Sequence, residues 1–418
     1  MTDVVSTVGT GPVDADSIDA DPLTPGYNAV LLAGFGGPEG PDDVMPFLRN
    51  VTRGRGIPEE RLVEVSHHYQ ALGGASPINQ QNRLLREALE AELARRGITL
   101  PVLWGNRNWA PYLADTIATA HADGQRRLLG VATSAYSSYS SCRQYREDFG
   151  LALSGTGLVG SVRIDKVRPY FDRPGFRLPF AEGTVDAVRQ AIATGLRTND
   201  LEIVFTTHSI PVTMADTSGS AELDDHRPGG AYVTQHLAVA RAVIEHVSAE
   251  LGSSPSWQLA YQSRSGPPSM PWLEPDINDV IDDLAAVGRR GVVVVPIGFV
   301  SDHVEVVWDL DNEAAETAAK HDLFFARVRT PGVEPRFVAE LADLVAERLA
   351  AGTPSDRVRD RVLPGAIRRP DFCASRCCVN SRATRPTTAA VDSAADWADL
   401  DVDPALLTRS GIRGTARP

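Results

Sequence analysis

A histidine that directly follows a short apolar run is the first feature of this sequence with the chemistry of a reactive site. Residues 204–211 read VFTTHSIP, so the run ends at Thr207 and His208 comes next. A run of this kind, bounded by Pro, is typical of a buried parallel strand. Open α/β sheets bind ligands just beyond the carboxyl ends of their strands. An imidazole there could accept a proton or bind a metal, although His208 could equally be a satisfied core histidine.

Three carboxylates recur every four residues in a second stretch. Residues 292–314 read VVVVPIGFVSDHVEVVWDLDNEA, which predicts a buried strand, a loop and then a helix. Glu305, Asp309 and Glu313 would lie on one face of that helix. Like charges so close together are unfavourable unless water or a cation neutralises them. The stripe is therefore either a cation-binding face or a solvated helix face.

Four cysteines form a third candidate group: Cys142, Cys373, Cys377 and Cys378. Cytosolic proteins seldom use disulfides, so clustered cysteines favour metal or redox chemistry. The alternative is that the three cysteines near the C-terminus are incidental thiols.

The composition limits the classes of function. The 418 residues carry a net charge of −13, with 43% hydrophobic and 23% charged residues. This balance is ordinary for a globular protein and argues against a nucleic-acid partner or an anionic membrane surface. No apolar run reaches the ~20 residues of a transmembrane helix, and the acidic first 24 residues are unlike a signal peptide. We therefore expect a cytoplasmic protein without a transmembrane segment.

Apolar runs alternate with amphipathic segments along the chain, which predicts parallel sheets with helices on both faces, in two units divided near residue 175. The predicted strands are 28–33, 100–105, 128–133, 161–165, 201–211, 257–262 and 291–299; the predicted helices are 59–72, 78–96, 112–122, 184–194, 229–251, 275–287 and 335–350. The predicted organisation is a disordered acidic tail (1–25), a first domain (26–175, completed by the 335–350 helix), a second domain with His208 and Glu305 (176–330), a C-terminal helix with a Cys-rich segment (331–380) and a disordered tail (381–418).

Six segments, in this order, carry a resemblance to a known family. They read GFGGPEGPDDVMPFLRN, HHYQALGGASPIN, SAYSSYSSCRQY, TTHSIP, YQSRSGPPSMPWLEPD and GFVSDHVEVVWDLDNEA. Together they resemble the ferrochelatases over about residues 27–350. The resemblance implies two Rossmann-like domains with a porphyrin cleft between them, and insertion of Fe²⁺, a substrate, into the ring.

The resemblance also implies roles for the acidic stripe and the histidine. His208 and Glu305 would face each other across the macrocycle, one accepting pyrrole protons and the other delivering iron, in an assignment that the sequence leaves open. Asp309 and Glu313 would line a hydrated path for the metal. The expected porphyrin contacts are Phe35, Arg53, His68, Tyr69, Ser76, Tyr136, Tyr145 and Trp272. Phe35 stands where some bacterial relatives have a Tyr that can ligate iron, so axial ligation from that side is in doubt.

Residues 40–57 read GPDDVMPFLRNVTRGRGI, a polar lip that contains Arg53 and Arg55. Such a lip suits coproporphyrin III, with four propionates, better than protoporphyrin IX. The resemblance to actinobacterial members points the same way. Thr52 replaces a further Arg of a relative, so one carboxylate contact could be missing or shifted.

Some ferrochelatases hold a [2Fe–2S] cluster on one internal and three C-terminal cysteines. Cys142, Cys373, Cys377 and Cys378 match this count, although the spacing of the last three departs from that of the animal enzymes. We expect a structural or sensory [2Fe–2S] cluster, with a structural zinc as the competing interpretation.

The leading hypothesis is Fe²⁺ insertion into coproporphyrin III in haem b synthesis. The alternatives are a protoporphyrin IX ferrochelatase, a non-catalytic porphyrin or haem carrier, and a chelatase for another tetrapyrrole. As partners we expect the porphyrin and ferrous iron, with a monomeric protein in at most transient contact with neighbouring enzymes of the haem pathway.

Overall fold

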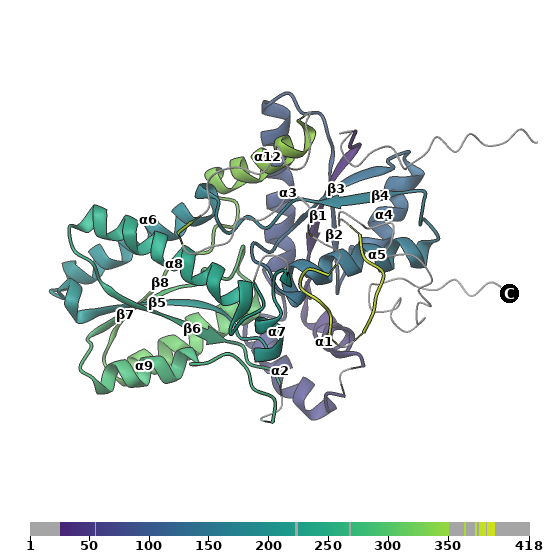
Figure 1. Ribbon diagram of the computed structural model, residues 1–418. Coiled ribbons are helices and arrows are strands. Elements are labelled where there is room, and N and C mark those ends of the chain that lie inside the picture. Colours follow the sequence, from purple (N-terminus) through teal and green to yellow (C-terminus); the bar gives the residue numbers. More distant parts are fainter. Residues whose placement is uncertain are drawn as a thin grey trace, which may run out of the picture.

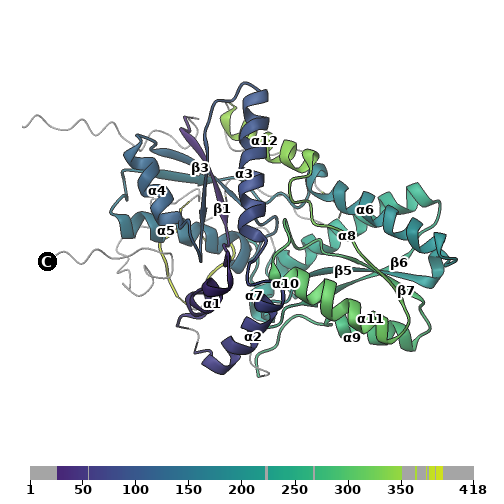
Figure 2. The same cartoon turned by 180° about the vertical axis from the view of Figure 1, so that it is seen from behind.

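The structure is a computed structural model that describes residues 26–54, 56–221, 225–266, 269–350, 363–364, 373, 376–381 and 383–388. The predicted acidic tail at 1–25, Arg55 and residues 389–418 lie outside the described residues. Figures 1 and 2 show two α/β units side by side.

The first unit is built on a four-stranded parallel sheet of order β2-β1-β3-β4. Its central strand reads AVLLAG and is buried on both faces, as parallel strands between helices are. Val30 and Leu32 face the helix α3, and Leu31 and Ala33 face α4 and α5. The elements are β1 (Ala29–Gly34), α3 (Ile78–Arg95), β2 (Val102–Asn106), α4 (Leu113–Ala122), β3 (Arg127–Ala132), the π-helix η2 (Tyr139–Arg143), α5 (Gln144–Thr156) and β4 (Arg163–Lys166).

The second unit repeats this arrangement with the parallel order β6-β5-β7-β8. Helices α6 and α8 pack on one face, and α9, η5 and α11 on the other. The elements are α6 (Pro174–Ala193), the 3-10 turn η3 (Thr198–Asp200), β5 (Leu201–His208), α7 (Val212–Asp216), α8 (Gly230–Leu251), β6 (Ser256–Gln262), α9 (Ile277–Ala286), β7 (Gly291–Val295), α10 (Val304–Val306), the π-helix η5 (Val307–Ala314), α11 (Ala315–Lys320) and β8 (Phe324–Arg327).

The predicted fold class is therefore confirmed. Some local elements differ from the prediction. Helix α6 begins at Pro174 rather than at Thr184, and continues through Pro179. Strand β8 was not predicted, because its four residues FFAR are all only partly buried and show no alternation.

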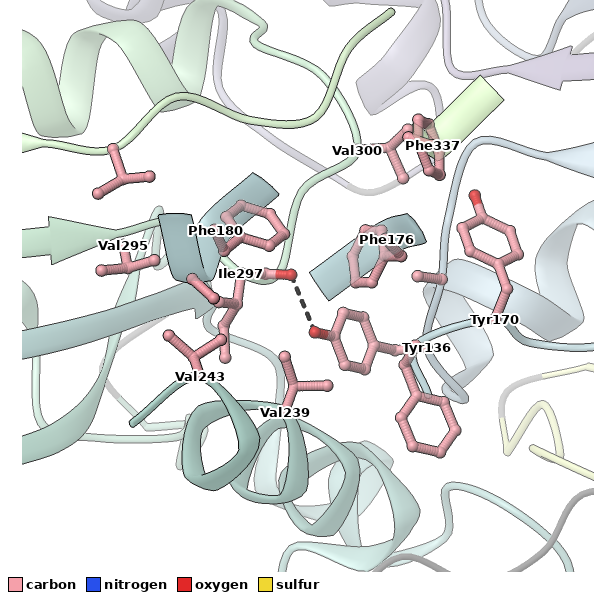
Figure 3. Packing of buried hydrophobic residues seen from close by; sticks show 14 of the residues in the cluster. Tyr136, Tyr170, Phe176, Phe180, Val239, Val243, Val295, Ile297, Val300 and Phe337 are labelled. Carbon is pink, nitrogen blue, oxygen red and sulfur yellow. Dashed lines mark hydrogen bonds between the residues drawn. The ribbon is translucent and has the colours of Figure 1, made fainter. Parts of the chain in front are cut away.

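One hydrophobic cluster contains residues of both units. Tyr136, which follows β3 of the first sheet, donates a hydrogen bond of 2.9 Å to the carbonyl of Ile297, which follows β7 of the second. Figure 3 shows this contact among Phe176, Val239 and Val243. Because the two sheets share this core, burial of apolar surface holds the units together.

The last long helix, α12 (Pro335–Leu349), crosses between the units. It packs on α3 and on α6. Its residue Asp343 pairs with Arg96 at 2.6 Å, and its Glu340 pairs with Arg173 just before α6. The helix thus contacts both units and ties them together.

Two short helices project beyond the first sheet (Figure 2). They are α1 (Val44–Thr52), preceded by the 3-10 turn η1 (Pro41–Asp43), and α2 (Glu59–Ala71). Their apolar residues pack with Val304 of α10, so this projecting lip contacts the second unit. None of the helices in the described residues is long and apolar enough to cross a membrane.

Candidate active site

His208 is the last residue of β5, at the carboxyl edge of the second sheet. Its Nδ1 lies 2.5 Å from the carbonyl oxygen of Ser209. A carbonyl only accepts, so Nδ1 carries the proton and donates, and Nε2 is left with its lone pair. The hydroxyl of Tyr232 donates to the backbone carbonyl of His208 at 2.8 Å, which fixes the end of the strand. His208 therefore presents a basic nitrogen from a rigid position.

The lone pair of His208 faces a carboxylate. Oε2 of Glu305, on α10, lies 3.7 Å from Nε2 of His208 and 3.9 Å from Nδ1 of His303. Burial lowers the pKa of His303, and the charge of Glu305 opposes this shift in part. Half of the Glu305 side chain is exposed. Two imidazoles thus lie beside a carboxylate that is half exposed, an arrangement that can transfer protons and that leaves the Glu305 carboxylate available to a cation.

The other two carboxylates of the stripe lie on the π-helix η5, whereas an ordinary α-helix was predicted. Such wide turns are rare and are frequently found at functional sites. Asp309 accepts hydrogen bonds from Gln262, at 3.2 Å, and from Ser263. Burial, aided by the charges of Glu305 and Glu313, raises the pKa of Asp309 to about 7. Asp309 can therefore hold or release a proton near neutral pH.

Aromatic side chains of the first unit lie beside this acidic group. Phe35, just after β1, is 37% exposed and meets Phe47 edge-on at 6.4 Å between ring centroids. Phe47 also contacts Tyr69 and Trp109, at 5.9 and 6.0 Å. Burial and the charge of Glu305 raise the pKa of Tyr69. Phe35 and Tyr69, two of the predicted porphyrin contacts, thus both pack on Phe47, and a flat apolar ring could lie against the exposed Phe35.

Four further predicted contacts lie around this region. His68 stacks on Trp308 of η5, with 4.3 Å between the ring centroids. Ser76 is buried and lies beneath Gly37. Arg53 is exposed at the end of α1, and Trp272 forms a β-bridge with Pro211, beside the His208 segment. Their roles as porphyrin contacts remain predictions.

Two predicted porphyrin contacts are placed in the interior. Tyr136 is 2% exposed, and its hydroxyl is bonded to Ile297. Tyr145 is 3% exposed, with Arg107 over its ring at 4.2 Å and its hydroxyl 3.4 Å from Thr133. Both hydroxyls are thus engaged by the protein, which favours packing roles for these two residues.

Sequence reasoning did not single out Gln262, Ser263, His303 or Trp308. Gln262 is the last residue of β6, next to β5, and Ser263 follows it, so the strand-end rule that identified His208 could have found them. Trp308 donates to Glu313 at 2.8 Å while it stacks on His68. Only the fold reveals that double contact.

The four cysteines meet between η2 and the C-terminal segment. Cys142 hydrogen-bonds to Cys373, which also bonds to Cys377. The sulfurs of Cys377 and Cys378 are 3.8 Å apart, and no disulfide links any of the four. The bond to Cys373 and burial raise the pKa of Cys142 well above its usual range. Four free thiols in one row, with Cys373 partly exposed and the other three buried, are a suitable donor set for an iron–sulfur group.

Backbone and cationic groups surround this row. The N–H of Gly219 donates to the sulfur of Cys378 at 3.1 Å. Arg146 and Lys166 lie near enough to Cys142 to lower its pKa in part. Within the described part of the chain, no three His, Cys, Asp or Glu side chains surround one point closely enough to hold a single metal ion. The four thiols therefore lie close together, but in the described residues they do not surround a single metal position.

The segment after these cysteines is docked on the first unit. Thr387 and Thr388 are buried, and the carbonyl of Pro386 lies where a Cβ on Gly150 of α5 would be. Glu147, also on α5, pairs with Arg385 at 3.8 Å. The ordered chain thus extends beyond residue 381, where the predicted disordered tail was to begin.

The chain is similar to known proteins over most of its length. The family described as Ferrochelatase matches residues 27–349. A coproporphyrin III ferrochelatase of Leifsonia xyli subsp. xyli is 56% identical over 85% of this chain and 92% of its own length. Those of Streptomyces coelicolor and Mycolicibacterium smegmatis are 51% and 48% identical, over 90% and 79% of this chain and 99% and 92% of theirs. A solved structure of SirB from Bacillus subtilis with Fe³⁺ has a TM-score of 0.43 and 13% identity, over 81% of this chain and all of that one.

Proposed function

Because the chain belongs to the ferrochelatase family, we propose that it inserts Fe²⁺ into coproporphyrin III, forming coproheme in the coproporphyrin-dependent synthesis of haem b. The observation that carries the proposal is the pair formed by His208 and Glu305, with 3.7 Å between Nε2 and Oε2. The relatives named as coproporphyrin III ferrochelatases support the choice of ring.

The reaction replaces two pyrrole protons by one Fe²⁺, so the site must accept two protons and supply a metal that has lost its water. The lone pair on Nε2 of His208 suits it to accept protons from the ring nitrogens. Glu305 offers an exposed carboxylate to the metal, a hard ligand of the kind Fe²⁺ accepts. Asp309 and Glu313 extend this acidic surface along η5 and would conduct hydrated Fe²⁺ to Glu305.

The projecting lip supports coproporphyrin III as the ring. Its helix α1 buries Val44, Phe47 and Leu48, so these apolar residues are used inside the protein. Arg53 is exposed at the end of α1, where it could pair with a propionate. A ring with four propionates gains more from such a lip than one with two.

The test is anaerobic Fe²⁺ insertion by the purified protein, followed by absorbance, with coproporphyrin III and protoporphyrin IX side by side. We expect turnover with a clear preference for coproporphyrin III. His208→Ala should abolish turnover and keep porphyrin binding. Preference for protoporphyrin IX would contradict the proposed ring, and tight porphyrin binding without turnover by the unaltered protein would favour a carrier.

We further propose that Cys142, Cys373, Cys377 and Cys378 hold a [2Fe–2S] cluster. A binuclear cluster takes two thiolates on each iron, and a row of four thiols suits that need better than one tetrahedral point. The N–H of Gly219 would donate to a ligating sulfur. When bound, the cluster would supply an oxidisable and removable group. Porphyrin metallation is not a redox reaction and has no need of such a group, so a structural or sensory role fits.

Anaerobically purified protein should show the visible absorption of a [2Fe–2S] centre, with two iron and two sulfide per chain. Cys142→Ser should remove that absorption. One zinc per chain without sulfide would instead support the structural zinc site.

Clustered cysteines that serve as ligands are typical of a reducing compartment, where disulfides are rare. We accordingly propose that the protein works in the cytoplasm.

A further inference from the structure

Arg327, the last residue of β8, connects the two segments that carry the acidic stripe. Its Nη1 lies 3.1 Å from Oδ1 of Asp302, in the loop before α10. Its Nη2 lies 2.8 Å from Oδ2 of Asp311, and its Nε donates to the other oxygen of the same carboxylate. One guanidinium thus pairs with two carboxylates, of which Asp311 is bound at both oxygens. Such forked pairing fixes geometry as well as charge.

The two partners of Arg327 lie close in sequence to the carboxylates of the acidic stripe. Asp302 directly precedes His303 and lies three residues before Glu305. Asp311 lies on η5 between Asp309 and Glu313. Arg327 therefore sets the position of the segment before the metal-binding carboxylate relative to the helix that leads to it.

The Asp302 loop is anchored by further contacts. The backbone N–H of Asp302 donates to Oε1 of Gln81, on α3 of the first unit, at 3.2 Å. Thr330 donates to Oδ1 of Asp302 at 3.0 Å, and the N–H of Gly332 donates to the carbonyl of Val300 at 2.8 Å. Asp302 is therefore a junction between the two units, and Arg327 is its charged partner.

We propose that Arg327 is a positioning residue for iron delivery: it holds Glu305 on one side and Asp309 with Glu313 on the other in register, without itself contacting iron or porphyrin. The inference rests on the proposed function. Without Arg327, Asp302 and Asp311 would add uncompensated negative charge beside the stripe, and η5 would lose its tether to the loop. Lysine could restore the charge but not the fork, because its ammonium is a single point charge.

The chain offers a matched control. Arg329 lies two residues away, is exposed, and lines the same open groove as Arg327 and Asp302. Arg327→Met and Arg329→Met therefore remove the same charge from the same face. Only the first substitution breaks the contacts with the two acidic segments.

The experiment measures kcat and KM for Fe²⁺ and for coproporphyrin III in the full-length protein and the variants, with porphyrin affinity by fluorescence quenching. A displacement of about 1 Å at a reacting site can lower the rate up to ~100-fold. We therefore expect kcat/KM for Fe²⁺ to fall about 10- to 100-fold in Arg327→Met. The loss should appear mainly in KM for Fe²⁺, because Arg327 positions the carboxylates that bind the metal. Porphyrin affinity should stay within about twofold. Arg327→Lys should recover part of the loss, and Arg329→Met should match the unaltered protein.

Unchanged iron kinetics in Arg327→Met would overturn the proposal, as would a parallel loss of porphyrin affinity, which a general structural defect would cause. If Arg327→Met does not fold, Asp302→Asn and Asp311→Asn test the same contacts, and the proposal fails if both leave KM for Fe²⁺ unchanged. Calorimetric Co²⁺ binding provides a readout without turnover. An unaltered protein that binds Co²⁺ more tightly than Arg327→Met but inserts no iron would refute the proposed function and keep the positioning role.

Discussion

The raised pKa of Asp309 makes a quantitative prediction about folding stability. Burial moves this pKa from its ordinary 3.8 to about 7. Each unit of pKa difference between folded and unfolded states corresponds to about 1.4 kcal/mol. Ionised Asp309 should therefore destabilise the fold by up to about 4 kcal/mol relative to the protonated form. Asp309→Asn removes this penalty and can still accept hydrogen bonds from Ser263 and Gln262 through its amide oxygen.

The sign of the pH dependence follows from proton binding. Between the two pKa values the folded state binds more protons at Asp309 than the unfolded state, so stability falls as the pH rises through this range and levels off above about 7. Between pH 5.5 and pH 8, ionisation of Asp309 should lower the free energy of unfolding of the unaltered protein by about 2 kcal/mol. It makes no contribution in Asp309→Asn, which has no carboxyl group at this position. The stability difference between the two proteins should grow by that amount.

The assay is urea unfolding of the metal-free proteins in chelator, followed by tryptophan fluorescence at pH 5.5, 6.5, 7.5 and 8. Other titrating groups, such as His68 and His303, are present in both proteins, so their direct contributions cancel. Asp186→Asn, at an exposed carboxylate of α6, is the control and should show no such change. A difference between Asp309→Asn and the unaltered protein that stays constant with pH would refute the argument from burial.

Three further substitutions test the packing that supports the site, each by urea unfolding. Tyr136→Phe leaves the buried carbonyl of Ile297 without its donor and should lower the free energy of unfolding by about 1–3 kcal/mol; an unchanged value would mean that water replaces the hydroxyl. Gly175→Ala places a Cβ 2.4 Å from the carbonyl oxygen of Arg336, so it should separate α6 from α12 and lower the midpoint by more than an exposed Gly→Ala change. Arg107→Met leaves the buried carboxylate of Asp148 without its cationic partner and should lower the free energy of unfolding by about 3–5 kcal/mol. A loss under ~1 kcal/mol would contradict the importance of the Arg107–Asp148 pair.

The sequence predicted the architecture because its signals are local. The VFTTH run and the GVVVV run of β7 are each buried on both faces, which only a parallel sheet between helices satisfies. The position of His208 followed from the end of such a strand. By contrast, FFAR of β8 joins the edge of the sheet and stays partly exposed, so its pairing with β7 is visible only in the fold.

The residues that surround the site were less predictable from the sequence than His208 and Glu305 at its centre. Glu305, Asp309 and Glu313 were expected on one regular helix, but Asp309 and Glu313 lie on the π-helix η5. There Asp309 accepts hydrogen bonds from Gln262 and Ser263, which are distant in sequence and could not be matched to it beforehand. Nothing local to an Arg at the end of β8 indicates that it pairs with carboxylates 25 and 16 residues upstream. Tyr136 and Tyr145 were predicted as porphyrin contacts, and the interior groups that their hydroxyls meet, the carbonyl of Ile297 and the hydroxyl of Thr133, could not be seen in the sequence.

The placement of α12 has a consequence for the order in which the chain can fold. Its Asp343 pairs with Arg96 at the end of α3, and Leu341, Leu344 and Val345 belong to the core that both sheets share. A ribosome therefore releases all of the first sheet long before the helix that covers α3 exists. Until residue 349 has emerged, that apolar surface must stay exposed or be shielded by a chaperone, and the first unit can complete its core only when the second has been synthesised.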